Sequence, residues 1–464
     1  MIRTFLAAAS ALTLAACAVG PDYRRPTTPA TATGAFVTAT PAVATIATDN
    51  DRWWQLYRDP VLDGLIADAL SANTDIRVAV ARLARARASL REVRGDRLPQ
   101  ATAGASATYG RLSAIQRPPG ADREDWTIDA GLDVAYEVDL FGRVSRGVEA
   151  ARGDVGAAEA DVDAVRVAIV AETTRAYADA ASSAERLTVA ERIVALLDRS
   201  LRVTESRARV GLTTGLDTAR IAALRNQRAA DVPALAAERQ TALFRLATLT
   251  GRTPADLPPL AAARIETLRL AQPIPVGDGT ALLARRPDIR AAERRLAAAT
   301  ARIGVATADL YPRISLGGSI GSTGTGLGNL FGAGPLNWLL GPLISWNVNP
   351  TQARARIAGA EADSQAALAT FDGAVLTALE ETETALSNYA RALDRRTALQ
   401  AARDQAAVAA RITRAQQREG QIDSLVQLDS ERTFADTEAA LALADAQITR
   451  LQIDLFRALG GNWS

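Results

Sequence analysis

The stretch WTIDAGLDVAYEVD, residues 126–139, alternates apolar side chains with polar or small ones over fourteen residues. A period of two is typical of a β-strand whose two faces meet different surroundings. Fourteen residues are long for a strand of a soluble protein, but they suit a tilted strand that crosses a bilayer. The sequence therefore predicts a membrane-spanning strand at this place.

The pattern changes directly after this strand. Residues 144–210 are rich in alanine and contain no proline, which predicts one continuous helix of about 67 residues. At 1.5 Å per residue this helix is roughly 100 Å long. A helix of that length does not fit the core of a globular domain. It should end before Gly211 and Gly215.

The amino terminus indicates where the chain is sent. Arg3 precedes an apolar run over residues 5–16, which predicts a signal peptide over residues 1–16. The run ends in LAAC, which resembles a bacterial lipobox, and there the thiol of Cys17 would be acylated. Ala18 stands where an aspartate commonly retains lipoproteins in the inner membrane, so the resemblance implies the outer membrane. The alternative is an incidental or buried cysteine.

The composition argues against several classes of function. The net charge is +1, with acidic and basic residues interspersed, so nothing favours nucleic-acid binding. The chain has no histidine and one cysteine, so the common nucleophilic, general-base and zinc chemistries lack their residues. We therefore expect no catalytic residue, no metal site and no cofactor apart from a covalent lipid on Cys17. A hydrolase that uses an acidic pair is the enzymatic alternative, and no α/β pattern supports it.

The elements of the first half can be placed in order. We expect a lipidated extended arm over residues 17–52 and a first repeat over residues 53–250, followed by a connector over residues 251–280. The first repeat should contain a helix over 60–97, strands at about 100–110 and 126–139, the long helix 144–210, and a helix over 216–249 with a kink at Pro233.

The second half repeats this order. Asp-Ile-Arg at 75–77 recurs at 288–290, and Glu-Thr at 172–173 recurs at 381–382. A tandem duplication predicts a second repeat over residues 281–464. It should contain a helix over 281–309, strands at about 313–323 and 336–348, a long helix over 352–419 and a shorter final helix.

Four membrane strands cannot close a barrel. They leave two unpaired edges, and each unsatisfied backbone group in lipid costs several kcal/mol. Two copies would give eight strands and a filled interior, whereas three copies give twelve strands and an open lumen. We therefore predict a mainly α fold with a trimeric 12-stranded β-barrel and an α-helical periplasmic tunnel.

Five motifs carry a resemblance to a known family: CAVGPDY at 17–23, YEVDLFGR at 136–143, RPDIRAAE at 286–293, DLYP at 309–312 and ALGG at 458–461. With them the chain resembles the outer-membrane efflux proteins, the TolC-like outer membrane factors, in their NodT or OprM-like lipoprotein branch. The second-half turn VNPTQAR, residues 348–354, departs from the Phe-x-Gly-Gly-Arg run that the family usually has there.

The resemblance implies a homotrimer that docks onto a periplasmic adaptor protein and an inner-membrane pump. It would pass drugs, metals or other small molecules passively out of the cell. A duct for type I protein secretion is the alternative within the family, and the sequence leaves it open because the pump selects the cargo. A structural coiled-coil surface protein is a further alternative, although it would not embed two strand pairs in a duplicated chain.

The resemblance also places functional residues at the periplasmic tip. Contact with the adaptor is implied for Val210, Gly211, Leu212 and Gly420, and the aperture for Asp217, Asp423, Asp429, Arg414 and Arg418. One aspartate per protomer becomes a ring of three like charges, which attracts cations in a narrow pore. The arginines would pair with acids of a neighbouring protomer. The alternative role for the first two aspartates is helix capping.

Aromatic residues lie near the ends of the predicted strands. Trp126, Tyr136, Trp338 and Trp346 are interpreted as a girdle at the membrane interface, with inward packing as the alternative. Arg286, Asp288 and Arg290 are interpreted as structural residues that tie the second-half helix to its neighbours.

Overall fold

The computed structural model describes residues 18–38, 43–44, 52–111, 113, 115, 120, 122–270, 273–325 and 336–461. The predicted signal peptide and Cys17 lie outside the described residues. Within these ranges no helix is both long enough and apolar enough to span a membrane.

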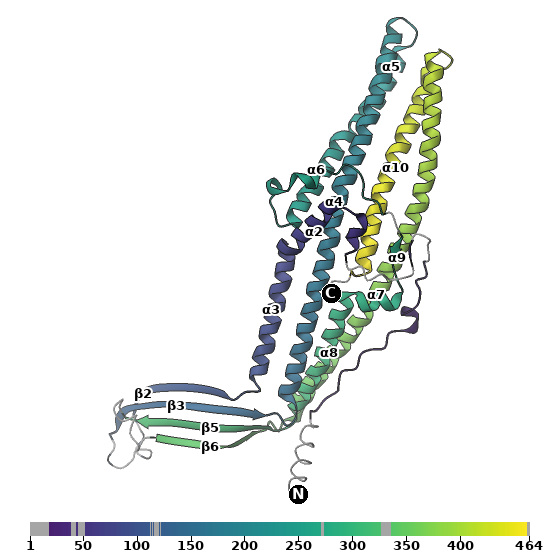
Figure 1. Cartoon of the computed structure of the whole chain (residues 1–464). Coiled ribbons are helices and arrows are strands. Elements are labelled where there is room, and N and C mark those ends of the chain that lie inside the picture. Colours follow the sequence, from purple (N-terminus) through teal and green to yellow (C-terminus); the bar gives the residue numbers. More distant parts are fainter. Residues whose placement is uncertain are drawn as a thin grey trace. The chain divides into compact units, whose positions relative to one another are not determined.

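Long helices dominate the chain (Figure 1). In chain order, the helices are α2 (Pro60–Ala72), α3 (Thr74–Gly95), α4 (Arg143–Arg209), α5 (Gly215–Ala229), α6 (Asp231–Leu249), α7 (Gly279–Arg285), α8 (Pro287–Ala308), α9 (Pro350–Arg418) and α10 (Ser424–Ala458). The strands are β1 (Val43–Ala44), β2 (Gln100–Arg111), β3 (Glu124–Val138), β4 (Ile274–Pro275), β5 (Arg313–Gly324) and β6 (Leu336–Ser345). Short 3-10 helices are η1 (Ala30–Ala32), η2 (Trp53–Tyr57), η3 (Pro254–Asp256) and η4 (Pro259–Ala262).

The chain divides into two compact units. Unit 1 comprises residues 1–26, 82–159 and 291–372, and unit 2 comprises residues 27–81, 160–290 and 373–464. The long helices α4 and α9 each contribute to both units.

Unit 1 contains a four-stranded antiparallel sheet in the order β2-β3-β5-β6. The register places Leu132 opposite Ile320, and Ile320 opposite Trp338, so these apolar side chains share one face. Asp133 opposes Ser319 on the other face. The sheet is therefore amphipathic over β2, β3 and β5, whereas β6 also carries Leu339 and Leu343 on the face of Asp133. The outer strands β2 and β6 leave their far edges without a partner strand among the described residues.

Four helices of unit 1 lie in a row that follows the strand order. Leu90 of α3 packs against Val148 of α4. Farther along α4, Gly153 lies so close to α8 that an added Cβ would come within 2.8 Å of the Cβ of Ala298. The hydroxyls of Thr300 on α8 and Ser364 on α9 are 3.5 Å apart. The row is α3-α4-α8-α9, with α3 and α9 at its two ends.

The N-terminal arm is anchored on unit 1. The backbone N–H of Val19 donates to the carbonyl of Phe141 at 3.2 Å. The buried guanidinium of Arg146 donates to Asp22 at 2.6 Å, and the hydroxyl of Tyr23 donates to Glu293 at 3.2 Å. These contacts hold residues 19–23 beside the turn between β3 and α4.

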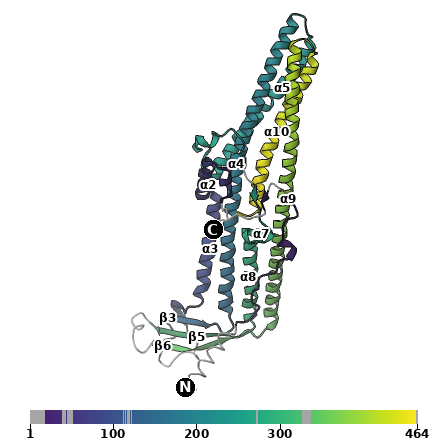
Figure 2. The ribbon, with the colours of Figure 1, turned by 45° about the vertical axis from the view of Figure 1, so that its right-hand side comes forward.

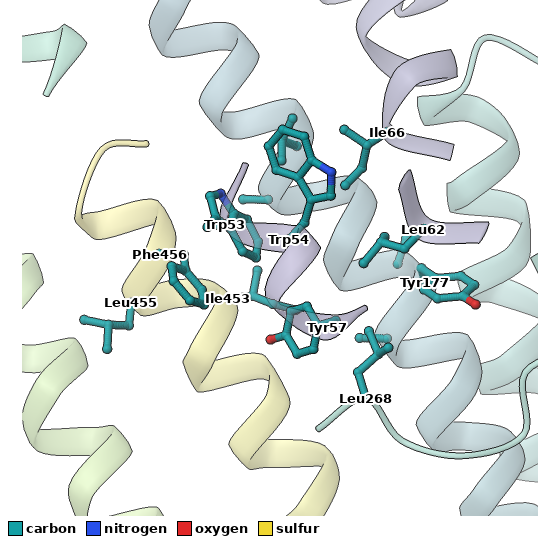
Figure 3. Packing of buried hydrophobic residues seen from close by; sticks show 14 of the residues in the cluster. Trp53, Trp54, Tyr57, Leu62, Ile66, Tyr177, Leu268, Ile453, Leu455 and Phe456 are labelled. Atoms are coloured by element: carbon teal, nitrogen blue, oxygen red, sulfur yellow. The ribbon is translucent and has the colours of Figure 1, made fainter. Parts of the chain in front are cut away.

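The main hydrophobic core belongs to unit 2 (Figure 3). Trp53 stacks on Phe456 with ring centroids 4.6 Å apart. The side chains of Leu62, Ile66 and Ile453 are almost fully buried in the same cluster. Burying such side chains contributes about 1.5 to 3 kcal/mol each, so η2, α2 and α10 are held together here.

Two predicted helices are broken in the structure. The predicted helix 60–97 is divided into α2, which ends at Ala72, and α3, which begins at Thr74. The division occurs because Asn73 adopts an extended conformation and its side chain accepts from the N–H groups of Asp75 and Ile76. The predicted helix 281–309 is broken at Arg286, which is extended because it precedes Pro287. Both breaks are absent from the sequence-based prediction.

Other element boundaries shift less. The break near Pro233 lies earlier, at Ala230, because proline is tolerated in the first turn of α6. The predicted strand 336–348 ends at Ser345. After it, the side chain of Asn349 accepts from the N–H of Thr351 at the start of α9, which begins at Pro350.

Candidate functional site

The strands carry the aromatic residues that the sequence analysis assigned to a membrane girdle. Trp126 and Tyr136 lie near opposite ends of β3, and Trp338 lies on β6. Trp346 follows the end of β6 and donates its indole N–H to the carbonyl of Leu310 at 3.1 Å. All four aromatic side chains are exposed, as a girdle requires.

The first tip turn joins α4 to α5. Gly211 has φ +76°, and its N–H donates to the carbonyl of Ala208 at 3.0 Å. The N–H of Leu212 donates to the carbonyl of Arg207 at 2.9 Å, which closes the end of α4. This turn presents Val210 and Leu212 to solvent, with 69% and 74% of their surface exposed.

Asp217 serves this turn as part of a capping box. Its carboxylate accepts from the N–H of Thr214 at 3.1 Å, and the hydroxyl of Thr214 accepts from the N–H of Asp217 at 3.3 Å. The hydroxyls of Thr214 and Thr213 also donate to it, at 2.7 and 2.9 Å. These bonds lower the pKa of Asp217, with the Thr214 hydroxyl as the largest cause. The carboxylate therefore stabilises the first turn of α5.

The second tip turn joins α9 to α10 and has the same geometry. Gly420 has φ +73°, and the N–H of Gln421 donates to the carbonyl of Gln416 at 2.9 Å. Asp423 occupies the N-cap position of α10, but its side chain makes no capping hydrogen bond. Figures 1 and 2 both show the two turns at the same end of unit 2. Arg207 on α4 joins them by donating to the carbonyl of Gln417 at 2.9 Å.

Arg414 contacts a residue that the sequence analysis did not select. Its Nε donates to Oε1 of Glu431 at 2.5 Å, and its Nη2 donates to Oε2 at 3.2 Å. The Glu431 side chain is 0% exposed and that of Arg414 is 30% exposed. This bidentate pair crosses from α9 to α10 within one chain.

The pair belongs to a buried polar seam between α9 and α10. The seam consists of Gln417, Gln427, Glu431 and Glu438, all buried. On α10 the buried positions are Gln427, Glu431, Ala435 and Glu438, at spacings of four, four and three. Such spacings are typical of the buried face of a helix. That spacing was the available sequence signal for Glu431. Two ion pairs connect the helices along this seam, Arg414 with Glu431 and Arg403 with Glu438 at 3.7 Å.

Asp429 and Arg418 lie away from the seam. Both side chains are exposed, and over the described ranges neither forms an ion pair within the chain. Asp423 is exposed as well. The structure thus brings Val210, Leu212 and Gly420 to one tip, and it leaves these acids available to solvent.

Arg286 has structural contacts. It donates to Asp288, to Glu381 at 2.8 Å and to the carbonyl of Ala458 at 2.9 Å. It thereby ties the start of α8 to α9 and to the end of α10. Arg290 donates to Asp163 of α4 at 3.1 Å. As for metals, no group of three or more potential ligands gathers in the described ranges.

Comparison with known proteins identifies the family. The family model described as outer membrane efflux protein matches residues 65–252 and 280–461. OprJ of Pseudomonas aeruginosa is 31% identical over 455 residues, which cover 98% of this chain and 94% of OprJ. The toluene efflux pump outer membrane protein TtgI of Pseudomonas putida is 32% identical over 462 residues, covering 98% and 97%.

A solved structure supports the same assignment. The outer-membrane channel OprN has a TM-score of 0.89 and 38% sequence identity, over 96% of this chain and 100% of that one. The resemblance read from the five sequence motifs is thereby confirmed. The chain belongs to the outer membrane efflux protein family.

Proposed function

We propose that this chain is the outer-membrane channel of a tripartite efflux system and passes small molecules out of the cell. Its relatives are outer membrane proteins, and the names of several describe efflux pump components. The family is one of transport channels and not of enzymes.

The four-stranded amphipathic sheet carries this proposal. One face holds Leu132, Ile320 and Trp338, and the opposite face holds Asp133 and Ser319. An apolar outer face and a polar inner face are what a membrane barrel with a water-filled lumen requires. The free edges of β2 and β6 cannot remain unpaired in lipid, so three copies would join them into one twelve-stranded barrel.

The proposal extends to the other parts of the chain. Residues 1–16 act as the signal peptide, and Cys17 carries the lipid at the head of the arm 17–52. Residues 53–250 and 281–464 are the two tandem repeats, joined by the connector 251–280. Similar element orders around β2-β3 and β5-β6 support the duplication.

The tip is the proposed aperture and docking end. Val210 and Leu212 are exposed apolar side chains at the end of a long helix, which suits contact with a periplasmic adaptor protein. Asp423 and Asp429 would line the closed pore once per protomer. An inner-membrane pump would supply the transported molecules.

The proposal is tested by measuring the mass and the conductance of the same detergent-extracted preparation. We expect a trimer that inserts into planar bilayers and gives a small, cation-preferring conductance. A monomer without conductance would contradict the shared barrel. A trimer without conductance would retain the assembly and contradict the channel.

A further inference from the structure

Three helices of unit 2, α4, α6 and α10, border two cavities that lie away from the tip turns. The first has a volume of about 310 Å³ and is lined mainly by apolar side chains, among them Ile193, Leu235 and Leu443. We call it the apolar cavity. The second has a volume of about 940 Å³ and is lined by five arginines and three carboxylates. We call it the arginine cavity. Both volumes lie within the range of small-molecule sites, roughly 300 to 1,000 Å³.

The two cavities adjoin each other. Arg186, Glu238 and Leu443 line both of them. The guanidinium of Arg186 donates to the carboxylate of Glu238 at 2.7 Å, so this ion pair lies at the boundary. The side chain of Leu443 is 43% exposed and leaves an apolar surface open at the same place. A ligand at this boundary would therefore meet arginines on one side and hydrocarbon on the other.

An ion pair places a third polar group close to the boundary. Arg450 of α10 donates to Asp179 of α4 at 2.6 Å. Along α4, Ser183 lies about one helical turn after Asp179, and Arg186 lies about two turns after it. The side chains of Ser183, Arg186 and Arg450 all line the arginine cavity. These three groups thus lie at the end of the arginine cavity that meets the apolar one.

Ser183 brings a buried hydroxyl that has no partner. The residue is 2% exposed, and within the described part of the chain its hydroxyl forms no hydrogen bond. The neighbouring Ser182 is also 2% exposed, but its hydroxyl donates to the carbonyl of Asp179 at 3.3 Å. Most buried polar groups have a hydrogen-bond partner. Ser183 therefore offers an unused donor to a ligand in the cavity.

The arginines also have donors to spare. A guanidinium has five N–H donors, and Arg186 and Arg450 each use one nitrogen for a carboxylate. The five lining arginines face three lining carboxylates and Asp454, which pairs with Arg175. Five positive charges against four negative ones leave one in excess, and Arg457 is the lining arginine that forms no ion pair among the described residues. The cavity therefore suits a ligand with a single negative charge.

We propose that the two cavities together bind a small amphiphilic anion of the fatty-acid class. Its carboxylate accepts from the hydroxyl of Ser183 and from unused N–H groups of Arg186 and Arg450. Its hydrocarbon chain lies in the apolar cavity against Leu235. Ser183 and Ala190, which lines the apolar cavity, are separated along α4 by roughly 10 Å, about the length of extended octanoate. The inference goes beyond the proposed channel, because this binding requires neither a pore nor a pump.

Equilibrium dialysis with radiolabelled octanoate tests the site on the full chain in lipid nanodiscs. We expect saturable binding in excess of that to empty nanodiscs. Octylamine has the same hydrocarbon chain with the opposite charge, and acetate has the carboxylate without the chain, so neither should displace octanoate. Displacement by octylamine or by acetate as effective as that by unlabelled octanoate would overturn the recognition of an amphiphilic anion.

A pair of neighbouring serines tests where the carboxylate binds. Ser183→Ala should raise the dissociation constant for octanoate roughly tenfold, because a hydrogen bond to a charged group is lost. Its midpoint of thermal unfolding should not fall, since the hydroxyl has no partner within the described chain. Ser182→Ala is the matched control, equally buried and outside both cavities, and should leave the affinity unchanged. Wild-type affinity in Ser183→Ala would overturn this placement.

A pair of leucines on α10 tests where the hydrocarbon chain binds. Leu443→Asn should also raise the dissociation constant roughly tenfold, because apolar contact area is lost at the boundary. Leu425→Asn is the matched control, since Leu425 is 48% exposed and lies outside both cavities. Equal affinities of these two variants would contradict the apolar half of the site.

Binding and conductance separate this inference from the proposed function. A wild-type trimer that conducts but shows no saturable octanoate binding would overturn the binding site alone. A chain that binds octanoate with the expected response to Ser183→Ala but does not conduct would overturn the channel alone.

Discussion

Glu431 is a buried carboxylate near the tip turn between α9 and α10. Its only charged partner among the described residues is Arg414, which reaches it from the facing helix. A buried carboxylate without its partner is costly, because the interior does not replace the lost hydration. Removing either partner should therefore weaken the contact between α9 and α10 near the tip.

Glu431→Ala is expected to loosen the tip. It leaves Arg414 without its carboxylate, and because that guanidinium is 30% exposed and regains some hydration, the cost should be about 2 kcal/mol. Hydrogen exchange of the α9–α10 turn should become faster, and single-channel conductance should rise. Asp404→Ala on α9, which removes an exposed acid, is the control. Unchanged exchange at the turn would contradict a holding role for the pair.

The capping box of Asp217 predicts a local dependence on pH. The Thr214 hydroxyl is the main cause that lowers the pKa of Asp217 in the folded protein. Its contribution to stability is therefore present above the unfolded pKa, which is about 4, and is lost as the pH falls through the lower folded value. Hydrogen-exchange protection of the first turn of α5 should decrease between pH 5 and pH 3.

Two comparisons control this experiment. Asp217→Asn should show low protection of that turn at both pH values. The start of α10 should change less than that of α5, because Asp423 makes no capping hydrogen bond there. Equal protection of the α5 turn in the wild type at pH 5 and pH 3 would show that the carboxylate does not stabilise it.

At the scale of elements, the close approach of α4 and α8 depends on a glycine. A Cβ at Gly153 would lie 2.8 Å from the Cβ of Ala298 and 3.0 Å from the carbonyl of Arg294. Gly153→Ala should therefore lower the stability by about 2 kcal/mol, because a rigid backbone cannot yield to the added methyl group. The midpoint of thermal unfolding in detergent measures the change.

Two further variants separate crowding from helix propensity. Gly64→Ala on α2 meets nothing within 4 Å and should be neutral or stabilising by about 0.5 to 1 kcal/mol. Ala298→Gly combined with Gly153→Ala should recover part of the loss. A Gly153→Ala variant as stable as Gly64→Ala would mean that α4 and α8 are not in close contact at this level.

Some helix boundaries could be predicted from the sequence and others could not, for physical reasons. The length of α4 followed from the absence of proline, and its end from Gly211, because both act through the local backbone. The break at Asn73 also depends on its amide donating to the carbonyl of Leu249 at 3.0 Å, a contact that no local pattern reveals. The Arg414 and Glu431 pair likewise required the register between two helices.

At the scale of the whole molecule, the assembly multiplies each charge by the number of copies. In the proposed trimer, Asp423 and Asp429 each become three carboxylates around one pore. The two side chains are exposed and without an ion-pair partner within the described chain, so no internal cation neutralises them. Such a ring attracts cations and holds anions back.

Asp423→Asn with Asp429→Asn should therefore reduce the cation-over-anion permeability ratio roughly severalfold, as expected when a charged ring is neutralised. Reversal potentials in a potassium chloride gradient measure this ratio, and the effect should weaken at high salt because exposed charges are screened. Asp256→Asn, in the connector, removes a carboxylate from each copy away from the tip and should leave the ratio unchanged. An unaltered ratio in the double variant would place the selective constriction elsewhere in the channel.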